Sequence, residues 1–154
     1  MLNGFWQSER GFTLMELVIV ITIMGIVFAI ASSTWFGAVE DRRVDSGTNR
    51  LAADLRQAHS IATNRLAGQT ITLAAGQSEY TLPNGNTADL DDNGGTGPAG
   101  DVISVAANST VVFHADGSAQ ITGANPITVQ ATNDPTNNHT IQINPATSEI
   151  KVGP

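Results

Sequence analysis

The longest apolar run of the chain lies near its N-terminus and limits what the chain can become. About 18 residues, Leu14 to Ala31, carry no charge except Glu16. As a helix they would extend about 27 Å, which nearly spans the hydrocarbon of a bilayer. Trp35 and Phe36 follow, where membrane helices place interfacial aromatic residues. The run therefore predicts a membrane anchor.

The charge inside this run indicates a role beyond anchoring. A carboxylate in hydrocarbon costs about 2.5–3.5 kcal/mol even on the mildest insertion scale, so an anchor that only faced lipid would not carry Glu16. An ordinary secretory signal, cleaved after Ala29-Ile30-Ala31, is the alternative interpretation of the run. Glu16 inside the run and Gly11 before it favour a retained anchor.

An amphipathic helix is predicted from Asp45 to Arg65. Its apolar residues recur at spacings of three and four, at Leu51, Leu55, Ala58, Ala62 and Leu66. No proline precedes Pro83, so the membrane helix can continue into this one. We expect bends at Gly37 and Gly47 and the end of the helix at Gly68.

The remainder of the chain has the pattern of short strands and turns. Segments rich in β-branched residues occur at 70–73, 80–82, 102–105, 110–113, 127–129, 140–143 and 149–152. Asp116-Gly117 predicts a two-residue hairpin turn between Val111–Phe113 and Ala119–Ile121. Pro145-Ala146-Thr147 predicts the last turn. These segments predict a β-rich head.

Charge and residue types exclude several classes of function. The net charge is −7 and the chain has no cysteine. Because Lys151 is the one cation after Leu66, the head carries the negative excess and should repel nucleic acid. The histidines, His59, His114 and His139, fall in a helix, a hairpin and a loop, and they suggest no catalytic group. We therefore expect no enzyme.

One acidic stretch fits a metal ligand pattern. Asp89-Leu90-Asp91-Asp92-Asn93-Gly94 resembles the opening of a calcium loop, although Gly100 stands where the closing glutamate belongs. Asp101, one residue later, could replace that ligand. The predicted Ca²⁺ ligands are thus Asp89, Asp91, Asn93 and Asp101, and the alternative is a solvated acidic loop from Asp89 to Gly100.

The N-terminal residues Gly11-Phe12-Thr13-Leu14-Met15-Glu16-Leu17 resemble the prepilin peptidase motif of the type IV pilin and type II secretion pseudopilin superfamily. The resemblance implies cleavage between Gly11 and Phe12 by the prepilin peptidase, followed by N-methylation of Phe12. It also implies that Glu16 meets the terminal amine of a neighbouring subunit. Pairing the two charges in hydrocarbon removes the cost of both, which would favour staggered assembly.

The head resembles the H-type minor pseudopilins (GspH/FimT-like). The similarity lies in the helix at 50–62, the strand at 70–73, the hairpin at 111–118 and the closing hairpin at 141–152. Two positions depart from that pattern: His59 replaces an arginine and Ala115 replaces a proline. DNA-binding members of this group carry a basic C-terminal segment, and the end of this chain has only Lys151, so we do not expect DNA binding.

Together these features predict an α+β pilin fold, a long N-terminal helix packed on a small antiparallel sheet. The expected parts are a leader (1–11), a transmembrane half-helix (12–36), an amphipathic half-helix (37–67) and a β-rich head (68–154). The expected function is that of a structural minor pseudopilin in a type II secretion pseudopilus. It would sit in the inner membrane as a single-pass protein with a periplasmic head. Its partners would be other pilin or pseudopilin subunits, the prepilin peptidase and the inner-membrane assembly platform.

Two alternatives stay open at this point. The first is a minor subunit of a type IV pilus used for adhesion, motility or DNA uptake, because the anchor and the head serve both machines. The second is a secreted β-domain that binds carbohydrate or protein and has an ordinary signal peptide.

Overall fold

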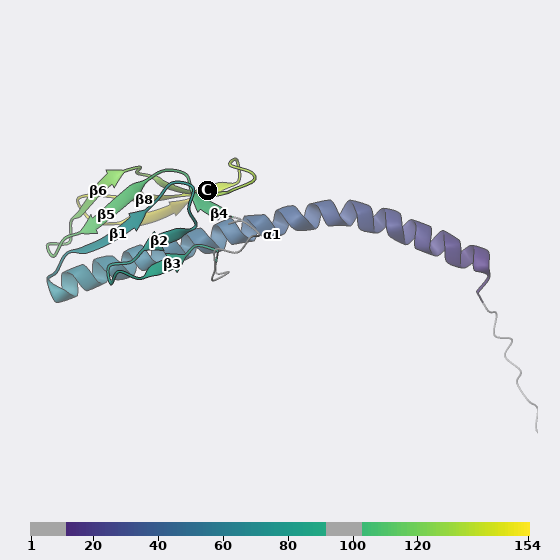
Figure 1. The fold of residues 1–154 in the computed structure, drawn as a ribbon, viewed down its shortest axis with the longest axis horizontal. Coiled ribbons are helices and arrows are strands. Elements are labelled where there is room, and N and C mark those ends of the chain that lie inside the picture. The colour runs from purple at the N-terminus through teal and green to yellow at the C-terminus, as the bar shows by residue number, and fades with distance from the viewer. Residues whose placement is uncertain (1–11, 92–102) are drawn as a thin grey trace, which may run out of the picture. The chain divides into compact units, whose positions relative to one another are not determined.

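The computed structural model describes residues 12–91 and 103–154, with the side chains of 33–37 excepted. Within these residues one helix precedes nine strands (Figure 1): α1 (Leu14–Arg65), β1 (Gln69–Leu73), β2 (Glu79–Thr81), β3 (Thr87–Asp89), β4 (Ile103–Val105), β5 (Ser109–Phe113), β6 (Ala119–Gly123), β7 (Ile127–Ala131), β8 (Asn138–Ile143) and β9 (Ile150–Gly153). The chain divides into two compact units, Met1–Gly37 and Ala38–Pro154. The predicted α+β class is confirmed.

The two glycines expected as bends do not interrupt α1, which continues as α-helix through Gly37 and Gly47. Gly47 is buried and has a packing role instead. A Cβ atom there would lie 2.4 Å from Cδ1 of Ile103 and 2.8 Å from the carbonyl oxygen of Leu90. Only glycine lets these residues come so close to the helix.

The helix ends earlier than Gly68, because Leu66 takes the left-handed conformation with φ 52°. The N–H of Ala67 then donates to the carbonyl of Ala62 at 3.2 Å, which is the Schellman type of helix end. Leu51, Leu55, Ala58 and Ala62 are buried as predicted. Leu66 is not part of that stripe: it lies beyond the helix and is 77% exposed.

The strands form two antiparallel sheets rather than the single small sheet expected. One sheet has the order β3-β2-β1-β5-β6 and the other β4-β7-β8-β9. Alternate residues of these strands point into the core, as the β-branched pattern predicts. Fully or almost fully buried examples are Ile71, Leu73, Val111, Phe113, Ile127, Val129, Ile141 and Ile143.

One strand and one turn differ from the sequence prediction. Strand β3 was missed, and its last residue, Asp89, pairs with Glu79 and so is not in a loop. The β5–β6 turn has three residues between His114 and Ser118 rather than two, because the N–H of His114 donates to the carbonyl of Ser118 at 2.9 Å. Gly117 supplies the positive φ, 85°, that such a turn requires.

Within residues 38–154, α1 contacts both sheets. Asn137 Nδ2 donates to Oδ1 of Asp41 at 2.7 Å, and Arg56 donates to the carbonyl of Ile150 at 3.3 Å. The Tyr80 hydroxyl, from the other sheet, donates to Asp54. Every buried apolar side chain of the described residues belongs to this unit. It therefore has a complete core, and we expect it to fold by itself.

Candidate functional site

The helix begins immediately after the residue predicted to become the mature N-terminus. Phe12 lies outside the helix and is 78% exposed. Thr13 caps α1: its Oγ1 accepts the backbone N–H of Glu16 at 3.2 Å, and its carbonyl accepts the N–H of Leu17 at 3.1 Å. Glu16 thus stands in the first helical turn, at the glutamate position of a capping box. Gly11 lies outside the described residues.

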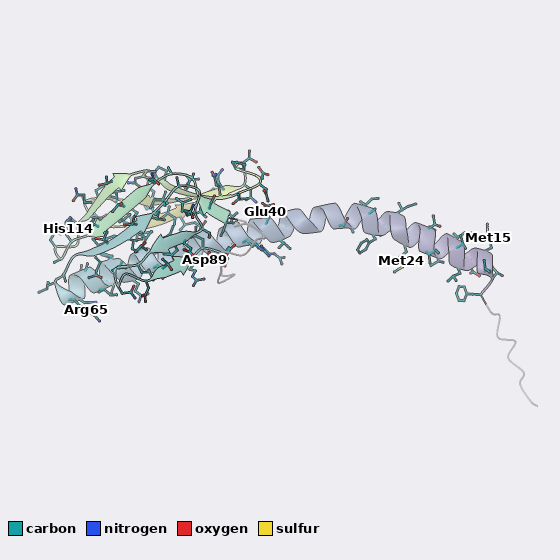
Figure 2. The ribbon with its side chains drawn as sticks, viewed as in Figure 1. Met15, Met24, Glu40, Arg65, Asp89 and His114 are labelled. Carbon is teal, nitrogen blue, oxygen red and sulfur yellow. The ribbon has the colours of Figure 1, made fainter. Side chains whose placement is uncertain are left out.

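The segment that follows is apolar on all sides. Leu14–Ser32 has a mean hydropathy of 2.7, and none of it is buried against the rest of the protein. Figure 2 shows Met15 and Met24 projecting from this part of the helix. The hydroxyls of Thr22 and Ser32 donate to the carbonyls of Val18 and Ala29, so these two hydroxyls are satisfied within the helix. A helix with these properties requires an apolar environment.

The acidic stretch is only partly described. Asp89 Oδ1 accepts the backbone N–H of Asp91 at 3.1 Å, a local turn of the kind aspartates form without a metal. Asn93 and Asp101 lie outside the described residues. Among the described residues no three histidine or acidic side chains gather as a metal site would require. The calcium site stays a prediction.

The three histidines have separate structural contacts. His59 packs its ring against Phe113, with ring centroids 5.6 Å apart. His139 Nε2 lies 3.2 Å from Oδ1 of Asp45, which joins β8 to α1. His114 opens the β5–β6 turn. The three histidines therefore lie in separate elements, but His139 is in strand β8, paired with Val129, and not in the predicted loop.

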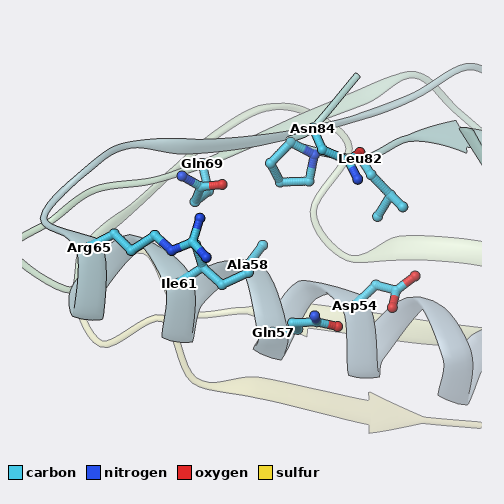
Figure 3. A pocket seen from close by; sticks show the side chains of 9 residues that line it. Asp54, Gln57, Ala58, Ile61, Arg65, Gln69, Leu82 and Asn84 are labelled. Atoms are coloured by element: carbon cyan, nitrogen blue, oxygen red, sulfur yellow. The ribbon is translucent and has the colours of Figure 1, made fainter. Parts of the chain in front are cut away.

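A groove that no sequence pattern indicated lies beside the second half of α1 (Figure 3). It has a volume of about 460 Å³ and lies between the helix, the start of β1 and the β2–β3 connection. Asp54, near one end, accepts the hydrogen bond from Tyr80. Burial raises the pKa of Tyr80 well above its ordinary value, and the bond to Asp54 raises it further. Tyr80 therefore stays protonated in the folded head at pH values where free tyrosine ionises.

This shift predicts a loss of stability in alkali. Below about pH 10, Tyr80 is protonated in both the folded and unfolded states. Above that pH the unfolded chain releases the proton and the folded head keeps it, so the free energy of unfolding should fall by about 1.4 kcal/mol per pH unit. Tyr80→Phe should remove most of this slope. The measurement is urea unfolding of residues 38–154 from pH 8 to about pH 11.

The test is specific because the chain has one tyrosine, and it has one lysine, Lys151, for a control. Lys151→Gln removes the lysine, keeps Tyr80 and its bond to Asp54, and should leave the slope intact. Equal slopes for the wild type and Tyr80→Phe would show that the hydroxyl is not held protonated by the fold.

Comparison with known proteins finds matches for both the N-terminal segment and the head of the chain. Residues 6–32 match the prokaryotic N-terminal methylation motif, and residues 47–147 match the family described as type II transport protein GspH. The second match covers more than half of the chain, so the chain belongs to the GspH family. Its apolar helix, which lies within the match to the methylation motif, is a membrane anchor.

One curated relative is the type II secretion system protein H of Aeromonas hydrophila. It is 37% identical over 67 residues, which cover 42% of this chain and 37% of the relative. The chain thus spans little more than a third of the length of that relative. No solved structure matches the chain.

Proposed function

We propose that the chain is a minor pseudopilin that joins the pseudopilus of a type II secretion system. The observation that carries this proposal is the order of two family matches on one chain, a methylation motif at 6–32 followed by a GspH domain at 47–147. The apolar helix Leu14–Ser32, which is not buried against the rest of the protein, supports the proposal, because a subunit needs an apolar helix surface to pack into the core of a filament.

The leader would be removed between Gly11 and Phe12, and Phe12 would then be N-methylated. Support comes from the motif match and from the position of Phe12, exposed and just before the helix cap. A cleavage site needs accessible backbone outside regular secondary structure, and Phe12 is exposed and precedes the helix. The mature subunit would stay in the inner membrane as a single-pass protein with its head in the periplasm.

Assembly would use Glu16 and the new terminal amine of Phe12. Glu16 lies one helical turn from Phe12, at the start of the apolar span. Each charge is costly in hydrocarbon, and a neighbouring subunit that supplies the opposite charge offsets both costs. The partners in this proposal are other pseudopilin subunits, the prepilin peptidase and the inner-membrane assembly platform.

Processing and secretion can be tested together in a strain that lacks the gene. The wild-type chain should restore secretion, and N-terminal mass spectrometry of the mature protein should find methylated Phe12. Gly11→Leu should leave unprocessed precursor in the membrane and fail to restore secretion, because a bulky side chain on the residue before the cleaved bond blocks the peptidase.

Phe12→Leu is the matched control, since it changes the residue after the bond and keeps Gly11. It should be processed. A mature N-terminus after Ala31 would refute the retained anchor. Normal secretion in the absence of the chain, with loss of surface pili, would instead assign it to a type IV pilus.

The acidic stretch gives a separate prediction about the head. We expect Ca²⁺ to bind through Asp89, Asp91, Asn93 and Asp101, in the weak range of about 10⁻⁴–10⁻³ M because the closing glutamate is missing. A ligand at 100 times its dissociation constant stabilises the folded state by about 2.7 kcal/mol. Melting curves of residues 38–154 with millimolar calcium and with chelator should therefore differ. Coincident midpoints, or an equal shift in Asp91→Asn, would refute the site.

A further inference from the structure

The groove beside α1 has an apolar floor between two walls, one from the helix and one from the β2–β3 connection. Ala58 and Ile61 line it from the helix, and Leu82 lines it from the β2–β3 connection. That connection is held by its own hydrogen bonds: the N–H of Leu82 donates to the carbonyl of Asn86 at 2.8 Å. Ile61 and Leu82 are half-buried, so part of their apolar surface is open to the groove. The groove is therefore preformed and able to take an apolar side chain.

Gln69 and Asn84, two amide side chains in the groove, each use one end of the amide in a hydrogen bond. The other end is available to a ligand. Gln69 Nε2 donates to the carbonyls of Ala67 and Gly68, at 3.3 and 3.0 Å, so its Oε1 is left as an acceptor. Asn84 Oδ1 accepts the N–H of Asn86 at 3.0 Å, so its amino group is left as a donor. An acceptor and a donor beside an apolar floor suit the N–H and C=O groups of an extended peptide.

The two charged residues of the groove differ in what they already bind. Asp54 is engaged by Tyr80. Arg65 is exposed, and no acidic side chain in the described part of the chain forms an ion pair with it. Figure 3 shows the Arg65 side chain extending along α1 toward the middle of the groove. An unpaired guanidinium in a head that is otherwise strongly acidic favours a ligand with a carboxylate.

The length of the groove limits the size of this ligand. From Asp54 to Arg65 the helix rises about 16 Å, which equals about five residues of extended chain. We infer that the groove binds an extended segment of about five residues, with an aliphatic side chain on the floor and a carboxylate at Arg65, contributed by a different pseudopilin subunit. This inference depends on the proposed function for the kind of partner. Its chemistry follows from the groove alone.

Site-specific photocrosslinking in the full-length chain, in cells that make the whole system, tests the inference. A photoreactive residue at Gln57, on the groove rim, should crosslink to another subunit with a prepilin-type N-terminus. Mass spectrometry of the crosslinked peptide should find an acidic, extended segment of that subunit. Arg65→Glu should lower the crosslink yield about tenfold, since a like charge now meets the carboxylate.

Arg42→Glu is the matched control, because it makes the same change of charge at an exposed position of α1 outside the groove. It should leave the yield unchanged. Exchange of the partner's acidic residue for arginine should restore the yield in Arg65→Glu. Crosslinks only to copies of this chain, or a yield that Arg65→Glu does not alter, would overturn the inference.

A failure of the inference can be told apart from a failure of the proposed function. In one outcome, the strain that carries Arg65→Glu has methylated Phe12, restored secretion and an unchanged crosslink yield. This outcome would reject the groove partner and keep the pseudopilin assignment. Absence of processing in the wild-type chain would reject that assignment and, with it, the identity of the partner.

Discussion

Glu16→Val is expected to leave the chain processed and inserted in the membrane but to lower its incorporation into filaments by about tenfold or more. The wild-type carboxylate gains most when a neighbour's terminal amine pairs with it in hydrocarbon. Valine has no charge to pair, so the drive for docking is lost while membrane insertion becomes easier. Co-purification with partner pseudopilins, compared with the amount of processed chain in the membrane, measures the effect.

The structure adds an alternative role that a second variant separates. Glu16 stands in the first turn of α1, three residues after the capping residue Thr13. Its side chain there can favour the helix start by accepting the backbone N–H of Thr13, as in a capping box, with or without a partner. Glu16→Gln keeps the side-chain shape and the ability to cap but removes the charge. Loss of assembly in Glu16→Gln supports the charge pairing, and normal assembly would show that capping is the role.

Gly47→Val is expected to destabilise the head strongly. The new side chain would meet the carbonyl oxygen of Leu90, which belongs to the backbone and cannot rotate away, and the Cδ1 atom of Ile103. Overpacking of this kind costs about 1–3 kcal/mol or more, in a domain whose total stability is about 5–15 kcal/mol. Urea unfolding of residues 38–154, followed by circular dichroism, should show a large fall in the midpoint.

The matched control places the same side chain one residue away. Ser46 is exposed on α1, so Ser46→Val should change the free energy of unfolding by about 0.5 kcal/mol or less. Gly47→Ala should destabilise as well, although alanine favours a helix by about 1 kcal/mol over glycine. A stability gain in Gly47→Ala would show that the glycine is a helix defect and not a packing requirement.

Much of the fold could be predicted because its signals are local. The stripe at Leu51, Leu55, Ala58 and Ala62 is a property of helical spacing, and it is buried in the structure. The strands with alternating β-branched residues appear within one or two residues of their predicted bounds. Strand β3 was missed because Thr87-Ala88-Asp89 has little strand propensity and forms through its pairing with β2.

The errors arose where a residue's role depends on distant parts of the chain. Leu66 continues the apolar spacing, but the chain leaves the helix there, so its side chain is exposed. Gly47 was interpreted as a bend from local propensity, and its actual role depends on Leu90 and Ile103. The division into two sheets follows from which strands pair, and propensity alone does not determine pairing.

The sequence by itself determined the membrane anchor, the processing motif and the family, because an apolar run and a motif at its start act through the order of residues. Only the tertiary structure decided the groove. Its walls come from α1, the start of β1 and the β2–β3 connection. Ala58 and Leu82, on two of these walls, are more than ten residues apart in the sequence. The free atoms of Gln69, Asn84 and Arg65 depend on which bonds the folded chain has already made. Those bonds join residues only one or two positions apart, and it is the packing of the helix against the β2–β3 connection that brings the free atoms to one groove.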